Sequence, residues 1–198
     1  MTLFTLSLMF FLIMDPFGNV SSYLKLVEKL PRKRQFLILG REMLIALGFM
    51  LLFNFIGEYL FDVLHISETA IRLASGLILF LAALKILFPS IDSPRANLPE
   101  GEPFIIPLAV PLIAGPALLA TIMLYTTLEP SQPLVLGAIF LSWVAASIVM
   151  FSSSVLYRIL GTNGLIACEK LMGMVLILLA IERFSTGVQL FITGKCCL

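Results

Sequence analysis

The chain has 198 residues, of which 60% are hydrophobic and only 13% are charged, and its mean hydropathy is +1.06. Soluble domains carry roughly 25% charged and 45–50% apolar residues, so this composition excludes a soluble globular domain. Thirteen Lys and Arg residues against twelve Asp and Glu residues give a net charge of +1, which offers no electrostatic attraction to nucleic acid. At ~20 residues per membrane-spanning helix, the length accommodates about six spans and no extramembrane domain.

Six charge-poor apolar stretches predict an all-α membrane protein with six transmembrane helices. They are Leu3–Leu24, Met43–Phe61, Leu73–Phe88, Phe104–Leu128, Leu134–Leu156 and Leu171–Ile192. The first stretch has neither a preceding basic segment nor a small-residue cleavage site, so we expect a retained span and not a signal peptide. We expect Gly161–Gly164 to be the connection between the last two spans, because glycine and asparagine end helices.

The basic residues are distributed unevenly over the alternate connections of this arrangement. One side carries Lys25, Lys29, Arg32, Lys33, Arg34, Arg41, Lys85, Arg95, Arg158 and Lys170, whereas the other carries Arg72, Arg183 and Lys195. Cytoplasmic connections are enriched in Lys and Arg. The first, third and fifth connections are therefore predicted to be cytoplasmic and both termini periplasmic.

The two halves of the chain resemble each other at an offset of 98 residues. The segment Arg72–Lys85 aligns with Lys170–Arg183, with a basic residue at both ends of each. Three spans per half would force the halves to insert in opposite orientations. We predict one membrane domain, residues 1–198, built from inverted three-helix repeats over 1–98 and 99–198, an organisation that recurs in secondary transporters.

The first span contains helix-breaking and polar residues near its middle, namely Asp15, Pro16, Gly18 and Asn19. Pro16 lacks a backbone donor and is expected to free the carbonyl of Leu12. An Asp at the bilayer centre costs about 2.5–3.5 kcal/mol on insertion scales, and non-helical backbone persists there only inside protein or beside a wet cavity. A functional break in the first span is therefore predicted.

The fourth span is interrupted at a corresponding place, because Pro116 follows Pro16 by 100 residues. New half-helices are expected to begin with Asn19 as N-cap in the first half and with Gly115 followed by Pro116 in the second. Their N-termini would offer N–H groups to a carboxylate. Asp15 and the freed carbonyls would suit an ammonium group, Na⁺ or a proton.

Several of these polar residues also have structural interpretations. Asp15 would then only cap the second half-helix, Asn54 would be an interhelical hydrogen-bond partner, and Glu182 with Arg183 would mark the interface or contact a neighbouring helix. Small residues four positions apart predict close packing of the fifth span. These are Ala138, Ser142 and Ala146.

The string Asp15–Asn19, the run Arg72–Lys85 and the segment Pro107–Pro116 together resemble the MarC family of bacterial integral membrane proteins. The resemblance covers essentially the whole chain and implies a six-span bacterial inner-membrane protein. The family is named for a link to multiple antibiotic resistance, and an archaeal relative is described as a transporter of small neutral amino acids. Members commonly have Gly after Ala-Gly-Pro, and Ala117 stands in that place here, which bears on how closely the backbone can approach a ligand.

The prediction is secondary transport of a small zwitterionic solute, such as a neutral amino acid, coupled to H⁺ or Na⁺. The expected substrate-binding residues are Asp15, Pro16, Gly18, Asn19, Gly115, Pro116 and Ala117. Asp15 would also couple the ion, and no cofactor, metal or nucleic acid is expected beside the solute, the ion and the lipid bilayer. The alternatives are a non-transporting membrane subunit that binds a partner and an intramembrane enzyme, for which Asp15 has no evident second carboxylate except Glu182.

The predicted topology can be tested with alkaline phosphatase fusions, since this enzyme is active only outside the cytoplasm. We expect activity for fusions after Leu198 or within Glu58–Glu68, and none for fusions within Pro31–Gln35, because the basic connection stays inside. Cellular phosphatase activity, normalised to fusion level, is the measurement. Phosphatase activity of a fusion within Pro31–Gln35 would show that the orientation is the opposite of the predicted one.

Overall fold

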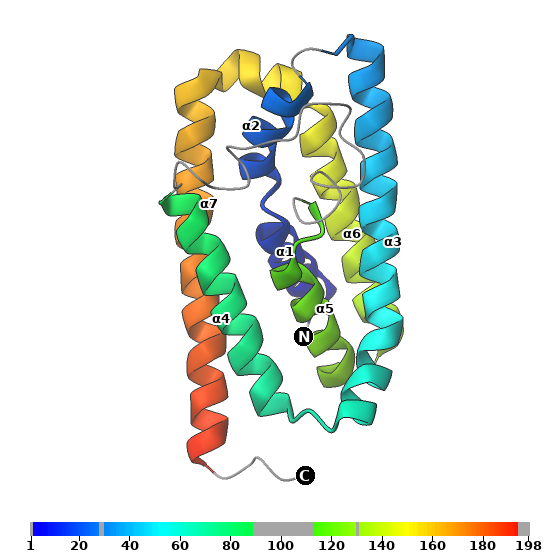
Figure 1. The fold of residues 1–198 in the computed structure, drawn as a ribbon, viewed down its shortest axis with the longest axis vertical. Coiled ribbons are helices and arrows are strands. Elements are labelled where there is room, and N and C mark those ends of the chain that lie inside the picture. The colour runs from blue at the N-terminus through cyan, green and yellow to red at the C-terminus, as the bar shows by residue number, and fades with distance from the viewer. Residues whose placement is uncertain (1, 28–29, 89–112, 130, 194–198) are drawn as a thin grey trace.

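The computed structural model describes residues 2–27, 30–88, 113–129 and 131–193. Within these ranges the chain forms seven helices and no strand, arranged as an elongated bundle (Figure 1). The helices are α1 (Leu3–Met14), α2 (Pro16–Val27), α3 (Arg32–Leu64), α4 (Glu68–Leu87), α5 (Pro116–Leu128), α6 (Gln132–Phe151) and α7 (Ser153–Ile192). Five segments are long and apolar enough to cross a membrane, and α5 is a shorter apolar helix. The all-α prediction is confirmed for the described residues.

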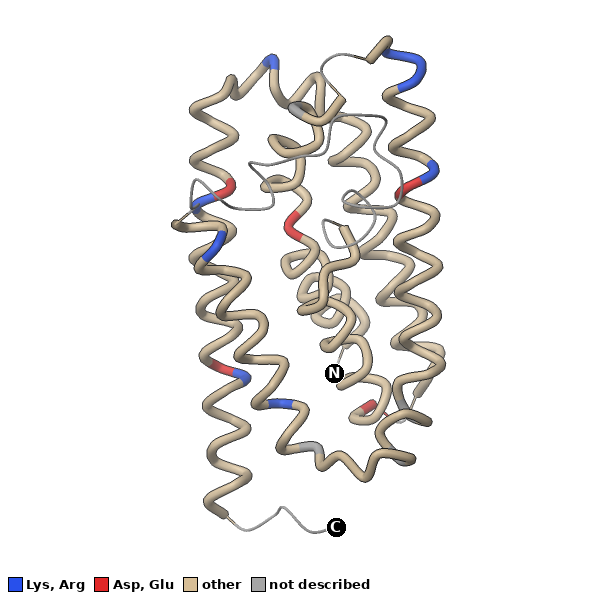
Figure 2. The backbone as a smooth tube through the Cα atoms, viewed as in Figure 1, with Lys and Arg blue, Asp and Glu red and all other residues tan. Residues whose placement is uncertain are grey.

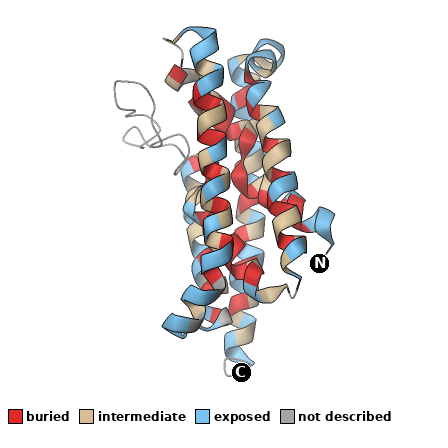
Figure 3. Ribbon diagram, turned by 90° about the vertical axis from the view of Figure 1, so that its right-hand side faces the viewer, coloured by how far each residue is buried: buried red, intermediate tan, exposed pale blue. Residues whose placement is uncertain are grey.

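The outer surface of the bundle is apolar, as a lipid-facing surface must be. Large side chains are exposed on several helices, including Phe55 (67%) on α3 and Leu178 (68%) on α7. Figure 3 shows buried positions on the inner faces of the helices and exposed positions on the outer ones. A soluble domain does not tolerate contiguous apolar exposure of this kind, so these helices form a multi-pass membrane protein.

The predicted end of the fifth span is wrong, whereas the predicted break at Gly161–Gly164 is present in the described residues. The helix α6 ends at Phe151, before the expected Leu156, and a short helical segment from Ser153 precedes the turn at Gly161. Gly161, with a non-helical φ of 64° and ψ of −176°, separates two helical segments of α7, which confirms the predicted interruption at this glycine. The predicted span Leu134–Leu156 is thus too long at its end.

The second and fourth spans also differ from the expected lengths. The helix α3 begins at Arg32, eleven residues before the expected Met43, because basic side chains at a helix end extend into the polar interface and need not end the helix. Of the predicted Phe104–Leu128 span, the described part is Ile113–Leu128, with α5 beginning at Pro116. Residues 104–112 of that span lie outside the described residues.

The helices α4 and α7 form the closest pair of the bundle and run side by side in opposite directions (Figure 1). Glycines on both helices allow this approach: a Cβ at Gly76 would lie 2.9 Å from the backbone N of Phe184, and one at Gly187 would lie 2.9 Å from the Leu73 side chain. Small residues drive helix association in lipid, where apolar burial gives little preference for protein over bilayer. This pair provides a rigid wall for the remaining helices.

Small and polar residues that the sequence identifies also lie at other helix contacts. Ala138, Ser142 and Ala146 are all buried on α6, which packs against α1, so their predicted packing role is confirmed. The amide nitrogen of Asn54 on α3 donates to Oε1 of Gln132 on α6 at 3.4 Å, which confirms an interhelical role for Asn54. Further contacts join α3 to α5 and α2 to α7.

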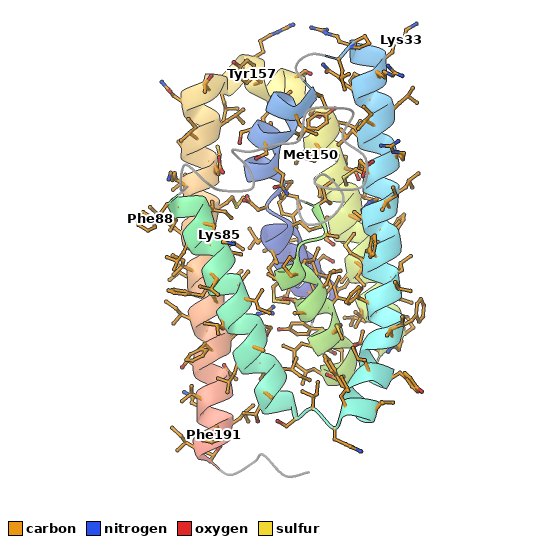
Figure 4. All side chains as sticks on the ribbon, in the orientation of Figure 1. Lys33, Lys85, Phe88, Met150, Tyr157 and Phe191 are labelled. Atoms are coloured by element: carbon orange, nitrogen blue, oxygen red, sulfur yellow. The ribbon has the colours of Figure 1, made fainter. Side chains whose placement is uncertain are left out.

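The two ends of the bundle differ in charge. Figure 2 shows most Lys and Arg positions in the half where α3 begins, and Figure 4 places Lys33 and Tyr157 at that end and Phe191 at the opposite one. The described ends of the chain both lie toward the less basic end (Figure 1). The described basic residues are therefore separated in space as the alternating connections predicted, while Lys29, Arg95 and Lys195 lie outside the described residues.

The close approach at Gly76 predicts a specific sensitivity. Gly76→Ala should lower the free energy of unfolding by about 1–3 kcal/mol, because the new methyl group meets the backbone of α7, which cannot rotate away. Gly48→Ala is the control: a Cβ there meets nothing within 4 Å, and alanine favours the helix by up to about 1 kcal/mol. Equilibrium unfolding in mixed micelles measures both, and equal stability of the two variants would contradict the close packing.

Candidate functional site

The first membrane span is broken at a single residue, Asp15. The helix α1 ends at Met14 and α2 begins at Pro16, while Asp15 adopts the left-handed conformation with φ 45° and ψ 58°. Asp is one of the few non-glycine residues that adopts this conformation readily, since its short side chain bonds to nearby backbone. The residue is 3% exposed, so the predicted break is confirmed and its carboxylate lies inside the protein.

Side chains of the break satisfy the backbone groups that it releases. Oδ1 of Asp15 accepts a hydrogen bond from the backbone N–H of Gly18 at 3.1 Å, which caps the first turn of α2. The Nδ2 group of Asn19 donates to the carbonyl of Met14 at 2.8 Å, which caps the end of α1. Asp15 therefore caps the second half-helix, as its structural interpretation predicts.

This geometry corrects two sequence predictions. Asn19 is not the N-cap of the second half-helix; Asp15 occupies that position, and Asn19 lies in the first turn of α2. The carbonyl of Leu12 is not freed by Pro16, because it accepts from the N–H of Asp15 at 3.1 Å. Both corrections arise because the chain turns one residue before the proline, so the helix restarts earlier than expected.

Gly18 makes room for the carboxylate of Asp15. A Cβ on Gly18 would lie 2.2 Å from Oδ2 and 2.8 Å from Cγ of Asp15, distances at which atoms overlap. The glycine thus allows the carboxylate to fold back over the first turn of α2. Pro16 and Asn19, the other predicted residues of this half, are also buried.

The second predicted half of the site lies at the start of α5. Gly115 is the N-cap, with Pro116 at the first helical position, as predicted. Gly115 supplies no side-chain cap, and its carbonyl accepts from the N–H groups of Leu118 and Leu119. Gly115 is half-buried, Pro116 is exposed and Ala117 is buried, so the three residues border the protein interior.

Arg183 contacts both broken spans, at the same distance from each break. Its Nη1 donates to Oγ1 of Thr121 on α5 at 2.7 Å, and its Nη2 donates to Sδ of Met9 on α1 at 3.1 Å. Met9 lies six residues before Asp15, and Thr121 lies six residues after Gly115. Because α1 and α5 run in opposite directions (Figure 1), both breaks lie ~9 Å along their helices from Arg183 and on the same side of it.

The sequence pattern does not predict the burial of two charged residues, Arg183 and Glu42. Arg183 is 7% exposed and contacts neighbouring helices, which confirms one of its two expected roles, but its position in the interior was not foreseen. The carboxylate of Glu42 on α3 is fully buried and pairs with Arg41 at 2.8 Å. Glu182, in contrast, is exposed, so it is not the second interior carboxylate beside Asp15.

A cavity of about 670 Å³ opens at the basic end of the bundle, between α2, the start of α3 and α7. Its polar lining includes Ser21, Arg32, Arg158 and Glu169, and Oγ of Ser21 donates to Oε2 of Glu169 at 3.2 Å. Ser21 lies six residues after Asp15 on α2, a rise of ~9 Å. The cavity therefore borders the helix that begins at the break.

Buried apolar contacts, lipid-facing side chains and a helix broken inside the bundle define a polytopic membrane protein. The chain belongs to the MarC family, whose model, described as "MarC family integral membrane protein", matches residues 1–192. It is 41% identical over 186 residues to the UPF0056 inner membrane protein YhgN of Escherichia coli K12, which covers 92% of this chain and 94% of that protein. It is 38% identical to a UPF0056 membrane protein of Buchnera aphidicola (92% and 94% covered) and 30% identical to one of Chlamydia pneumoniae (95% and 94% covered). No solved structure matches the chain.

The contact between Gly18 and Asp15 predicts non-additive mutations. Gly18→Ala should displace the carboxylate and weaken the cap of α2, lowering the free energy of unfolding by about 1–2 kcal/mol. In an Asp15→Ala background the same methyl group meets no carboxylate, so the loss in free energy of unfolding caused by Gly18→Ala should fall by at least half. Unfolding of the wild type, both single variants and the double variant in mixed micelles measures the coupling.

Gly40→Ala is the matched control, since the nearest atom to a Cβ there is 3.8 Å away, on the side chain of Phe151. It should cause no loss of stability. If Gly18→Ala lowers the free energy of unfolding by the same amount in the Asp15→Ala background as in the wild type, the glycine does not serve to make room for the carboxylate.

Proposed function

We propose that this protein is a secondary transporter of a small zwitterionic solute, of the size of a neutral amino acid, coupled to H⁺ or Na⁺. The observation that carries the proposal is the break at Asp15, where a carboxylate lies inside the bundle at the junction of two half-helices. Ionisable residues within membrane spans are rare and mark ion or substrate pathways by default. Discontinuous helices are a recurrent means of building such sites in secondary transporters.

The chemistry of the two breaks suits opposite ends of a zwitterion. The start of α5 presents backbone N–H groups and the positive end of a helix dipole, both of which favour a carboxylate. Asp15 supplies a negative charge for an ammonium group or the coupling ion. Capping through Oδ1 is compatible with this second role, because a carboxylate has two oxygens and several lone pairs.

The packing pattern supports inverted repeats over 1–98 and 99–198. If the broken first span corresponds to the α5 span, then α3 corresponds to α6 and α4 to α7. The contact of α1 with α6 is then matched by that of α5 with α3, and the contact of α2 with α7 by that of α5 with α4. The close pair α4 and α7 would lie on the pseudo-two-fold axis. Alternating access by movement of one repeat against the other follows naturally from such an arrangement.

The location and orientation that we propose are the bacterial inner membrane with the basic end in the cytoplasm and both termini in the periplasm. The name of the Escherichia coli relative includes "inner membrane protein", and the gathering of Lys and Arg at one end follows the positive-inside tendency. The cavity lined by Arg32, Arg158 and Glu169 would then open toward the cytoplasm and provide a route to the breaks.

The proposal predicts a separation between transport and folding at Asp15. Asp15→Asn keeps the shape and a capping oxygen but removes the charge, so gradient-driven uptake should fall at least tenfold while the protein still inserts and purifies. Asp15→Glu should also be impaired, since one extra methylene displaces the carboxylate from its position over Gly18. Uptake of labelled glycine, alanine and serine into proteoliposomes, with imposed H⁺ or Na⁺ gradients, measures both.

Glu182→Gln is the matched control, because this carboxylate is exposed and should be dispensable for uptake. Unchanged gradient-driven uptake in Asp15→Asn would remove the coupling role. Loss of folding without a separate effect on uptake would reduce Asp15 to a helix cap, and no uptake by the wild type of any zwitterion would favour a non-transporting membrane subunit.

A further inference from the structure

Arg183 is a buried cation whose described contacts are all neutral. It lies on α7 nine residues before the end of the helix, ~14 Å along its axis, within the membrane-spanning part. Besides the Thr121 hydroxyl and the Met9 thioether, its guanidinium faces the ring of Tyr125, with Cζ 5.6 Å from the ring centroid. No carboxylate forms an ion pair with it in the part of the chain that the structure describes.

These contacts leave the charge without a compensating anion. A thioether sulfur is a weak acceptor, and a ring face attracts a cation without neutralising it. Arg72 on α4 adds an unfavourable like charge to the environment of Arg183. The same chain pairs its fully buried Glu42 with Arg41, as buried charges normally require.

The guanidinium is nevertheless held in a fixed position. Thr121 donates its own proton to the carbonyl of Ala117 at 2.6 Å, so its oxygen is oriented to accept from Nη1 of Arg183. Two of the five N–H donors of a guanidinium are used in the described bonds. The remaining donors suit the bidentate geometry that arginine offers to carboxylates.

We propose that Arg183 is the centre of a buried anion site between α1, α5 and α7, which binds a carboxylate or a small inorganic anion. The site is distinct from the two breaks, since it lies ~9 Å from each along α1 and α5. Thr121 positions the guanidinium, and through Ala117 it connects the site to the start of α5. Where the anion is the carboxylate of the transported solute, the site rests on the proposed transport function; where it is a free inorganic anion, it does not.

Anion-dependent stability of the purified full-length protein tests the proposal without measuring transport. The melting temperature is followed in low-salt buffer while sodium acetate, sodium chloride or L-alanine is added. A ligand that binds the folded state raises the melting temperature in a saturable way. We expect such a rise for the wild type and for Arg34→Gln, an exposed arginine in the first turn of α3, and none for Arg183→Met.

The substitutions also separate an anion site from a structural contact. Arg183→Met should match or exceed the wild-type melting temperature without added anion, because it removes an uncompensated buried charge at similar volume. Arg183→Lys keeps the charge but loses the planar fork, so saturation should need at least tenfold more anion. A saturable effect of alanine alone assigns the site to the solute, whereas one of acetate or chloride alone assigns it to a free anion; both support the site.

Three results would overturn it. The first is that the rise in melting temperature with each of the three probes is the same in the wild type and Arg183→Met. The second is that Arg183→Met, without added anion, is less stable than the wild type or does not fold. The third is that the wild type and Arg183→Lys reach saturation at the same anion concentration. Failure of transport in proteoliposomes would leave an anion-dependent rise unaffected, so the two proposals fail separately.

Discussion

A helix that is interrupted inside a bilayer must satisfy its released backbone groups from its own neighbours, because lipid offers no hydrogen bonds. The break at Asp15 meets this requirement within five residues: the Asp15 carboxylate caps α2, and the Asn19 amide caps α1. The absence of a side chain on Gly18 gives the carboxylate its place. The same side chains that would serve a ligand are therefore also those that keep the span intact, which is why stability and transport must be measured separately.

The rest of the bundle holds this break in place. The helix α7 uses its small residues to pack closely on α4, and from the same helix Arg183 reaches α1 and α5. One rigid helix thus contacts both interrupted segments at equal distance from their breaks. Rigid elements position sites more accurately than loops do, so these contacts of α7 help to fix the two breaks at the same depth.

Charge is distributed for two different purposes in this protein. Lys and Arg at one end of the bundle lie where water and headgroups solvate them (Figure 2), and they bear on orientation. Asp15, Glu42 and Arg183 lie in the interior, where each charge costs free energy unless another group compensates it. Glu42 pairs with Arg41 and the Asp15 carboxylate caps α2, whereas Arg183 lies between α1 and α5, where the proposed anion would bind.

The sequence by itself determined the membrane class, the break beside Pro16, the start of α5 at Gly115 and Pro116, and the packing face of α6, because composition, missing backbone donors and small-residue spacing act locally. It did not determine that Asp15 and not Asn19 caps α2, since both residue types are good caps and only the observed end of α1 selects between them. Nor did it show that a short helical segment lies between Ser152 and the turn at Gly161. The inward position of Arg183 has a signal in the sequence, since Gly173, Ala180 and Gly187 lie on the same buried face. The outward side of this part of α7 is also largely apolar, with Leu178, Ile181 and Phe184 exposed, so hydrophobicity does not distinguish the two sides. Only the packing against α4, α1 and α5 decided which side is interior.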